Sequence, residues 1–221
     1  MEKIDSFIRG KSGNLPFKIT NIVLFYYIFW KICVDIYLVR HTSLNADKAI
    51  CYGQSEVHLA STFLQEASDT AKLIPERHNA VFVASPVRRC VQLAEYLSRR
   101  PPMTDKRILD LNFGDWELKR WEHIDPIVLD SWTRNAVHTS CPNGESYTDL
   151  FTRSIEFFDE LTAKNQKAAV IVTHASVIRC LLMYVLAIPF ERSFDMRIAY
   201  GSVSKIKIED GSVSVDFINR I

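Results

Sequence analysis

The chain has 221 residues, with 27 Lys and Arg against 26 Asp and Glu, so its formal net charge is +1. This charge gives no overall attraction to nucleic acid or to an anionic membrane, and any anion site has to be local. The composition is 48% hydrophobic and 24% charged, which is typical of a globular protein and excludes a disordered or fibrous one. The five cysteines are odd in number and form no C-x-x-C pair, which favours a reducing compartment and predicts a cytoplasmic protein.

Residues 1–33 are predicted to be an extension that precedes the folded domain. An aromatic and aliphatic run at 22–30 is soon followed by Lys31, and too few apolar residues remain to span a bilayer if Ile36–Val39 form a core strand. A signal peptide would need a small-residue cleavage site after the run, which is absent. Two interpretations stay open. Either translation begins at Val34, or the extension forms an amphipathic, membrane-associated helix; we expect no membrane association.

From residue 34 onward, short apolar runs alternate with longer helical patterns, which favours a single α/β domain over 34–221 with a mostly parallel sheet. The predicted strands are Val34–Val39, Ala80–Ala84, Lys106–Leu109 and Ala168–Thr173. The predicted helices are Ser61–Ile74, Pro86–Arg99, Asp125–Asn135, Glu145–Lys164 and Ala175–Ala187. The tail predicts a hairpin at a sheet edge, because Asp210-Gly211 is a favoured two-residue turn between two alternating strands.

Three of the predicted strands are followed by cationic or imidazole side chains. The first ends in Arg40-His41, the second is followed by Arg88-Arg89, and the last is followed by His174. Ligands of open α/β sheets bind beyond the carboxyl ends of the strands, so we expect these groups to converge. Guanidinium forks match the oxygens of a phosphate, and the start of the helix after the last strand adds backbone donors. The sequence therefore predicts a phosphate site.

His41 is the predicted nucleophile, because a neutral imidazole can attack phosphorus and nearby positive charge lowers its pKa. The segment Phe113–Glu117 supplies carboxylates among aromatic residues, which could protonate a leaving oxygen. Structural alternatives stay open for the individual pieces. Ser85-Pro86 is also typical of a helix N-cap followed by proline at the first helical position, and His174 alone could cap a strand end.

Together these segments resemble the histidine phosphatase superfamily, also called phosphoglycerate mutase-like, over nearly everything from Val34 to the C-terminus. The matching motifs are Leu38-Val39-Arg40-His41, Ser85-Pro86-Val87-Arg88-Arg89, Phe113-Gly114-Asp115-Trp116-Glu117 and Val172-Thr173-His174. They follow one another in the order of the family. The resemblance implies a three-layer α/β/α sandwich around a mostly parallel central sheet.

The resemblance also implies a role for each matching residue. His41 takes the phosphoryl group, while Arg40, Arg89 and His174 stabilise its oxygens. Glu117 protonates the leaving oxygen and then activates water, with Asp115 as the alternative acid. No metal ion or other cofactor is implied, because the arginines and histidine supply the charge stabilisation.

Within the superfamily, Arg40–Ser43 followed by Ile50–Ser55 is similar to α-ribazole phosphatases. This similarity implies a small phosphate ester as substrate, α-ribazole 5'-phosphate of cobalamin nucleotide-loop assembly, with Thr42, Gly53 and Gln54 as further substrate contacts. Thr42 stands where the family commonly has glycine, so the backbone there must avoid a positive φ. The alternatives are a phosphatase for sugar phosphates or nucleotides, a phosphoglycerate mutase and an inactive binding module.

The aromatic segment around Glu117 suggests a further hypothesis about the leaving group. Trp116 or Trp121 would stack on a benzimidazole base, if the substrate carries one. Core packing is the structural alternative for both side chains.

Overall fold

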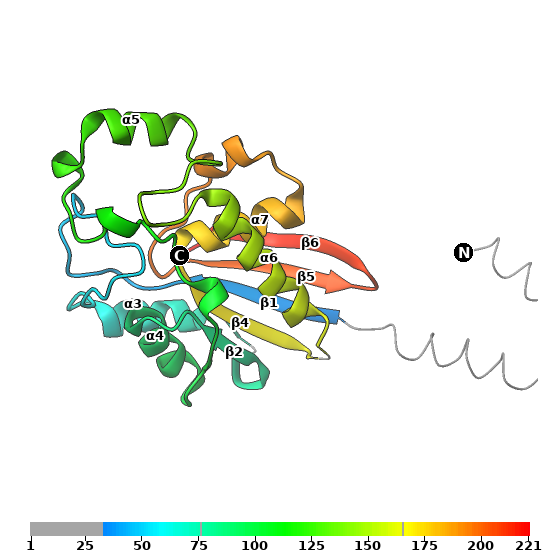
Figure 1. The fold of residues 1–221 in the computed structure, drawn as a ribbon. Coiled ribbons are helices and arrows are strands. Elements are labelled where there is room, and N and C mark those ends of the chain that lie inside the picture. Colours follow the sequence, from blue (N-terminus) through cyan, green and yellow to red (C-terminus); the bar gives the residue numbers. More distant parts are fainter. Residues whose placement is uncertain (1–32, 76, 165) are drawn as a thin grey trace, which may run out of the picture. The chain divides into compact units, whose positions relative to one another are not determined.

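The computed structural model describes residues 33–75, 77–164 and 166–221 (Figure 1). The predicted extension 1–33 lies outside the described residues, apart from Cys33. The strands are β1 Cys33–Arg40, β2 Val81–Ala84, β3 Met103–Thr104, β4 Ala168–Thr173, β5 Val203–Glu209 and β6 Ser212–Arg220. They form one six-stranded sheet in the order β3-β2-β4-β1-β5-β6.

The sheet is parallel except at β5. The strand β1 pairs in parallel with β4 on one side and antiparallel with β5 on the other, and β2 pairs in parallel with β3 and β4. Every residue of β4 is buried, as expected for a central strand that is covered on both faces. The parallel arrangement brings the carboxyl ends of β1, β2 and β4 to one edge of the sheet.

Helices cover both faces of the sheet, so the predicted three-layer α/β/α sandwich is confirmed. The helices are α3 Phe63–Lys72, α4 Arg88–Ser98, α5 Pro126–Arg134, α6 Tyr147–Thr162 and α7 Ala175–Leu186. Figure 1 shows α3 and α4 on one face and α6 and α7 on the other. On the first face, Tyr37, Phe82 and Val170 of the sheet pack with Ala67 of α3 and Leu93 of α4. Within the described ranges, none of the helices is long and apolar enough to cross a membrane.

The prediction of a strand over Lys106–Leu109 is wrong. Residues 106–108 form a 3-10 helix, because the Asp105 carboxylate accepts a hydrogen bond from the backbone N–H of Arg107 and caps it. The third parallel strand is the two-residue β3, which precedes this cap. Ile108 is fully buried in the 3-10 helix. The apolar residues that suggested a strand therefore pack in the core but do not pair in the sheet.

The other predicted elements are present, with ends that differ by one or a few residues. The predicted C-terminal hairpin is confirmed, and β6 lies at the edge of the sheet. Asp210 and Gly211 both have positive φ, 51° and 77°, which is the conformation that lets a two-residue turn follow the twist of the strands.

The capping of α6 at Ser146 can be tested by substitution. Ser146 forms a capping box with Asp149: its hydroxyl donates to the carboxylate and accepts from the backbone N–H. Replacing Ser146 by alanine should lower the free energy of unfolding by about 1 kcal/mol, or about 3 °C in Tm. The matched control Ser131→Ala, at an exposed position within α5, should stay within about 0.5 kcal/mol of the unsubstituted chain. Equal effects of the two substitutions in thermal unfolding would contradict the capping role.

Candidate active site

The structure brings together the four side chains that the strand ends predicted, namely Arg40, His41, Arg89 and His174. The two imidazole rings lie edge to face with their centroids 5.3 Å apart. Both arginines are close enough to act electrostatically on both histidines. Figure 1 shows the segment 43–61 and α5 beyond the carboxyl ends of the strands, where these residues lie.

His41 has the tautomer that a nucleophile requires. Its Nδ1 lies 2.9 Å from the carbonyl oxygen of Thr42, and because a carbonyl can only accept, Nδ1 carries the proton and the lone pair stays on Nε2. Burial holds the pKa of His41 well below its usual value, and His174, Arg89 and Arg40 lower it further. The ring is therefore neutral at pH 7.

His174 is held at the start of α7 by the end of the neighbouring strand. Its Nε2 lies 2.9 Å from the hydroxyl of Ser85 and 3.6 Å from Sγ of Cys90. Burial, followed by the neighbouring guanidiniums, holds the pKa of His174 well below its usual value. The N-cap interpretation of Ser85 is wrong: α4 begins at the exposed Arg88 and its N-cap is Val87. The serine hydroxyl serves the site instead.

The two arginines are held by backbone carbonyls. Arg89 is fully buried and donates to the carbonyls of Gly53 and Ser55, at 2.5 and 2.8 Å. Arg40 donates to the carbonyl of Ile198 at 2.6 Å. Neither arginine forms an ion pair with a carboxylate among the described residues. Carbonyl partners orient a guanidinium without neutralising its charge, so the site keeps its attraction for an anion.

Several polar atoms of the site are buried without a hydrogen-bond partner in the part of the chain that the structure describes. They are Nε of Arg40 and of Arg89, Oγ1 of Thr42 and Nδ1 of His174. Buried polar atoms are rarely left unpaired in native proteins. The oxygens of a phosphate would accept from the guanidinium and hydroxyl donors. The backbone of Thr42 has no positive φ, as its place in the motif predicted.

The two carboxylates of the segment Phe113–Glu117 differ in their surroundings. Both oxygens of Glu117 accept hydrogen bonds: one from the backbone N–H groups of Gln54 and Phe113, at 2.9 and 3.2 Å, and the other from the hydroxyl of Ser55. Asp115 is exposed. Glu117 thus ties its own segment to the loop that holds Arg89, and its role as acid stays a prediction.

Asp110 was missed by the sequence reasoning, although it lies in the site. Its Oδ2 is 3.5 Å from Nδ1 of His174, and its Oδ1 accepts from the hydroxyl of Ser176. The side chain is 17% exposed, so part of it is open to solvent. The sequence does contain a signal for Asp110, because this residue follows directly on the apolar pair Ile108-Leu109. Arg40, His41 and His174 were predicted from the same pattern, a polar residue at the end of an apolar run.

Gly53 and Gln54 lie in the loop that contacts Arg89 on one side and Glu117 and Asp110 on the other. Gly53 has a φ of +39°, and a Cβ there would approach Oε1 of Glu117 to 2.5 Å and the carbonyl of Leu111 to 2.7 Å. Only glycine lets the backbone pass this close. The side-chain amide of Gln54 donates to the carbonyl of Asp110 at 2.9 Å. Both residues support the walls of the site, and their contact with substrate stays a prediction.

The tryptophans near the site differ in exposure. Trp116 is 4% exposed and packs edge to face with Trp132, with ring centroids 5.4 Å apart. It belongs to a cluster with Cys51 and Cys141, so it has no free face on which a base could stack. The stacking hypothesis is wrong for Trp116, whereas Trp121 is only partly buried and its role stays a prediction.

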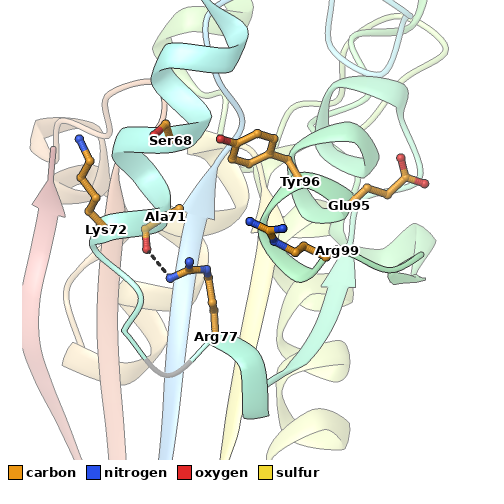
Figure 2. Close-up of a pocket in the computed structure, with 7 residues that line it drawn as sticks. All are labelled: Ser68, Ala71, Lys72, Arg77, Glu95, Tyr96 and Arg99. Carbon is orange, nitrogen blue, oxygen red and sulfur yellow. Dashed lines mark hydrogen bonds between the residues drawn. The ribbon is translucent and has the colours of Figure 1, made fainter.

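A separate groove of about 560 Å³ lies between α3 and α4. Figure 2 shows Arg77 and Arg99 extending into the space between the two helices. Arg77 donates to the carbonyls of Ala71 and Ile74, at 3.1 and 3.4 Å. Its charge is therefore directed at the carbonyl end of α3. The groove contains no histidine, and the reactive groups lie elsewhere.

Known proteins resemble this chain over most of its length. The model of the Histidine phosphatase superfamily (branch 1) matches residues 36–221. The Yersinia pestis protein named "Probable phosphoglycerate mutase GpmB" is 26% identical over 189 residues, covering 80% of this chain and 86% of that protein.

Two solved structures share the fold. The alpha-ribazole phosphatase from Shigella flexneri superposes with a TM-score of 0.76 at 21% identity, covering 84% of this chain and 96% of its own. The mycobacterial glucosyl-3-phosphoglycerate phosphatase gives 0.74 at 21% identity, covering 86% and 100%. At these identities the two structures show a common fold, and their substrates differ.

The lowered histidine pKa values predict a stability that falls as the pH is lowered. In the unfolded chain a histidine takes up a proton below about pH 6.5, whereas buried His41 stays neutral, so the unfolded state binds more protons. Between pH 7 and 5.5 this difference should cost about 1 kcal/mol for His41. We expect His41→Asn to show a smaller fall in Tm over this range than the unsubstituted chain, in phosphate-free buffer.

The matched control for that measurement is His123→Asn, since the His123 side chain is 67% exposed and lies outside the site. It should keep the full pH dependence of the unsubstituted chain. Identical slopes of Tm against pH for all three proteins would contradict the neutral, buried state of His41.

Proposed function

This chain belongs to the histidine phosphatase superfamily, and we propose that it is a phosphomonoesterase that works through a phosphohistidine formed on His41. The observation that carries the proposal is the meeting of a neutral imidazole with two guanidiniums whose charge no described carboxylate neutralises. A phosphate group is an anion whose oxygens match such donors. The start of α7 at His174 adds the favourable end of a helix dipole.

In the first step, the lone pair on Nε2 of His41 attacks phosphorus, and the bond from phosphorus to the leaving oxygen breaks. Arg40 and Arg89 stabilise the charge on the phosphoryl oxygens, with His174 beside them. A carboxylic acid gives its proton to the leaving oxygen. In the second step the same carboxylate takes a proton from water, the water oxygen bonds to phosphorus, and the bond to Nε2 breaks to release phosphate.

Two carboxylates are candidates for this acid, Glu117 from the motif and Asp110 from the geometry. The Oδ2 of Asp110 is beside His174, in a partly exposed position, whereas donors from the loop occupy both oxygens of Glu117. An acid must reach the leaving oxygen, so the geometry favours Asp110. On this assignment Glu117 is a positioning residue, because it holds the loop whose carbonyls hold Arg89.

For the substrate, we propose α-ribazole 5'-phosphate, on the basis of the similarity of Arg40–Ser43 and Ile50–Ser55 to α-ribazole phosphatases. The shared fold with the Shigella flexneri enzyme is consistent with this proposal. The second candidate is a phosphatase for sugar phosphates or nucleotides, and the comparable fold similarity to a glucosyl-3-phosphoglycerate phosphatase supports a sugar phosphate. All five cysteines are free, which supports a reducing, cytoplasmic location.

A single assay tests activity and substrate together. The protein should release phosphate from α-ribazole 5'-phosphate faster than from a panel of sugar phosphates and nucleotides, with no effect of EDTA. His41→Ala should lower kcat/KM by at least about a thousandfold. Acid-quenched protein should carry a phosphoryl group that His41→Ala lacks, as seen by mass spectrometry of the intact chain.

Each other outcome of that assay has a defined meaning. Preference for a different ester would retain the mechanism and reject the proposed substrate. Phosphate transfer between carbons of phosphoglycerate, dependent on a bisphosphorylated primer, would identify a mutase. No turnover of any ester would favour an inactive binding module and contradict the proposed function.

Esters with different leaving groups distinguish the two candidate carboxylates. Loss of the general acid should lower kcat/KM about a hundredfold or more for an alkyl phosphate, and much less for 4-nitrophenyl phosphate, whose leaving oxygen needs no proton. We expect this dependence for Asp110→Asn, while Glu117→Gln should lower activity on both esters by a similar factor. A dependence on the leaving group in Glu117→Gln instead would assign the acid to Glu117.

A further inference from the structure

The two arginines that face the phosphate site are held by segments far apart in the sequence. Arg40 donates to the carbonyl of Ile198, in the segment before β5, while Arg89 donates to the carbonyls of Gly53 and Ser55, in the loop after β1. A single phosphate can use both guanidiniums only if their separation is fixed. Some contact therefore has to hold the two segments in place relative to each other.

Tyr52 and Tyr200 form such a contact. Tyr200 lies two residues after Ile198, and the guanidinium carbon of Arg40 is 3.7 Å from the centroid of its ring. Tyr52 directly precedes Gly53, and its ring centroid is 5.5 Å from the guanidinium carbon of Arg89. The two hydroxyl oxygens lie 3.0 Å apart, within hydrogen-bond distance. Each tyrosine thus contacts one arginine, and the hydrogen bond joins the two tyrosines.

The surroundings favour a persistent bond between the hydroxyls. Both tyrosines are partly buried, so water competes less for their polar atoms. Burial and the bond to Tyr200 raise the pKa of Tyr52, so its hydroxyl keeps its proton at neutral pH. The ring of Tyr200 also lies 5.4 Å from that of His41, which places the pair beside the nucleophile as well as beside the arginines.

Building on the proposed function, we propose that the Tyr52–Tyr200 pair is a positioning element that fixes Arg40 and Arg89 at the separation needed to bind one phosphate group. The aromatic ring of Tyr200 holds the Arg40 guanidinium by a cation–π contact. The hydrogen bond between the two hydroxyls links Tyr200 to Tyr52, and so to the loop whose carbonyls hold Arg89. Neither residue takes part in bond making or breaking.

The test measures the affinity of the full chain for inorganic phosphate by isothermal titration calorimetry, which needs no turnover. Tyr200→Phe and Tyr52→Phe each remove the hydroxyl bond and should weaken binding about fivefold. The double variant should show about the same fivefold loss, because the bond can be lost only once. Tyr200→Leu also removes the ring over Arg40 and should weaken binding at least about tenfold more than Tyr200→Phe.

Matched controls come from Tyr96, which is 39% exposed and lies in the groove between α3 and α4. Tyr96→Phe and Tyr96→Leu should leave the affinity for phosphate unchanged. With an ester that the protein hydrolyses, Tyr52→Phe and Tyr200→Phe should raise KM more than they lower kcat, whereas Asp110→Asn should do the reverse.

Losses that multiply in the double variant would overturn the proposal, and so would an affinity within twofold of the unsubstituted chain for every tyrosine variant. A chain that binds phosphate with the expected coupling but hydrolyses no ester would overturn the proposed function and retain the positioning role. Absence of phosphate binding by the unsubstituted chain would overturn both.

Discussion

The site depends on burying positive charge without neutralising it. Arg89 is completely removed from solvent, and a second guanidinium and two imidazoles share its surroundings. Burial of an unpaired charge is costly, so the protein supplies the carbonyls of Gly53 and Ser55 as partners. A carboxylate there would have been a stronger partner, but it would have cancelled the field that attracts a phosphate. Backbone carbonyls are uncharged acceptors, so they hold the guanidinium and leave its charge available to an anion.

The same constraint accounts for the state of the histidines. With cations nearby and no access to water, both imidazoles are more stable neutral than charged. Neutrality makes His41 a nucleophile, and the carbonyl of Thr42 directs the lone pair to Nε2. The Oδ2 of Asp110 lies 3.5 Å from Nδ1 of His174, and among the described residues Asp110 forms no salt bridge with Arg40 or Arg89. It can therefore serve proton transfer while the arginines stay free for phosphate.

The sequence predicted the part of the site that strand ends determine. Arg40, His41 and His174 come directly at the ends of apolar runs, and parallel pairing of β1 and β4 brings such ends together. For Ser85 the local pattern left an N-cap role open beside its place in the phosphate motif, but tertiary packing directs its hydroxyl to His174. Local patterns could not predict this bond, since its partners are far apart in the chain.

The loop residues were harder to predict for the same reason. Asp110 follows a capped 3-10 turn that looks like a strand in an apolar pattern, so its place beside His174 was not recognised. Tyr200 lies in a segment with neither helix nor strand, and its contact with Tyr52 spans most of the domain. Contacts between loops depend on the whole fold, whereas strand ends depend on periodicity and parallel pairing.

The segment 113–132 is held by different contacts from those that hold Arg40 and Arg89. Its aromatic rings pack around Cys51, and Trp116 is buried in that packing. The helix α5, which begins within this segment, has no buried residue and exposes Ile127 and Val128. Ile127 and Val128 form none of the hydrogen bonds that hold the arginines and histidines, so substitutions there should disturb these side chains little. The two solved structures with this fold bear names that record different esters, because a fold alone does not determine the substrate.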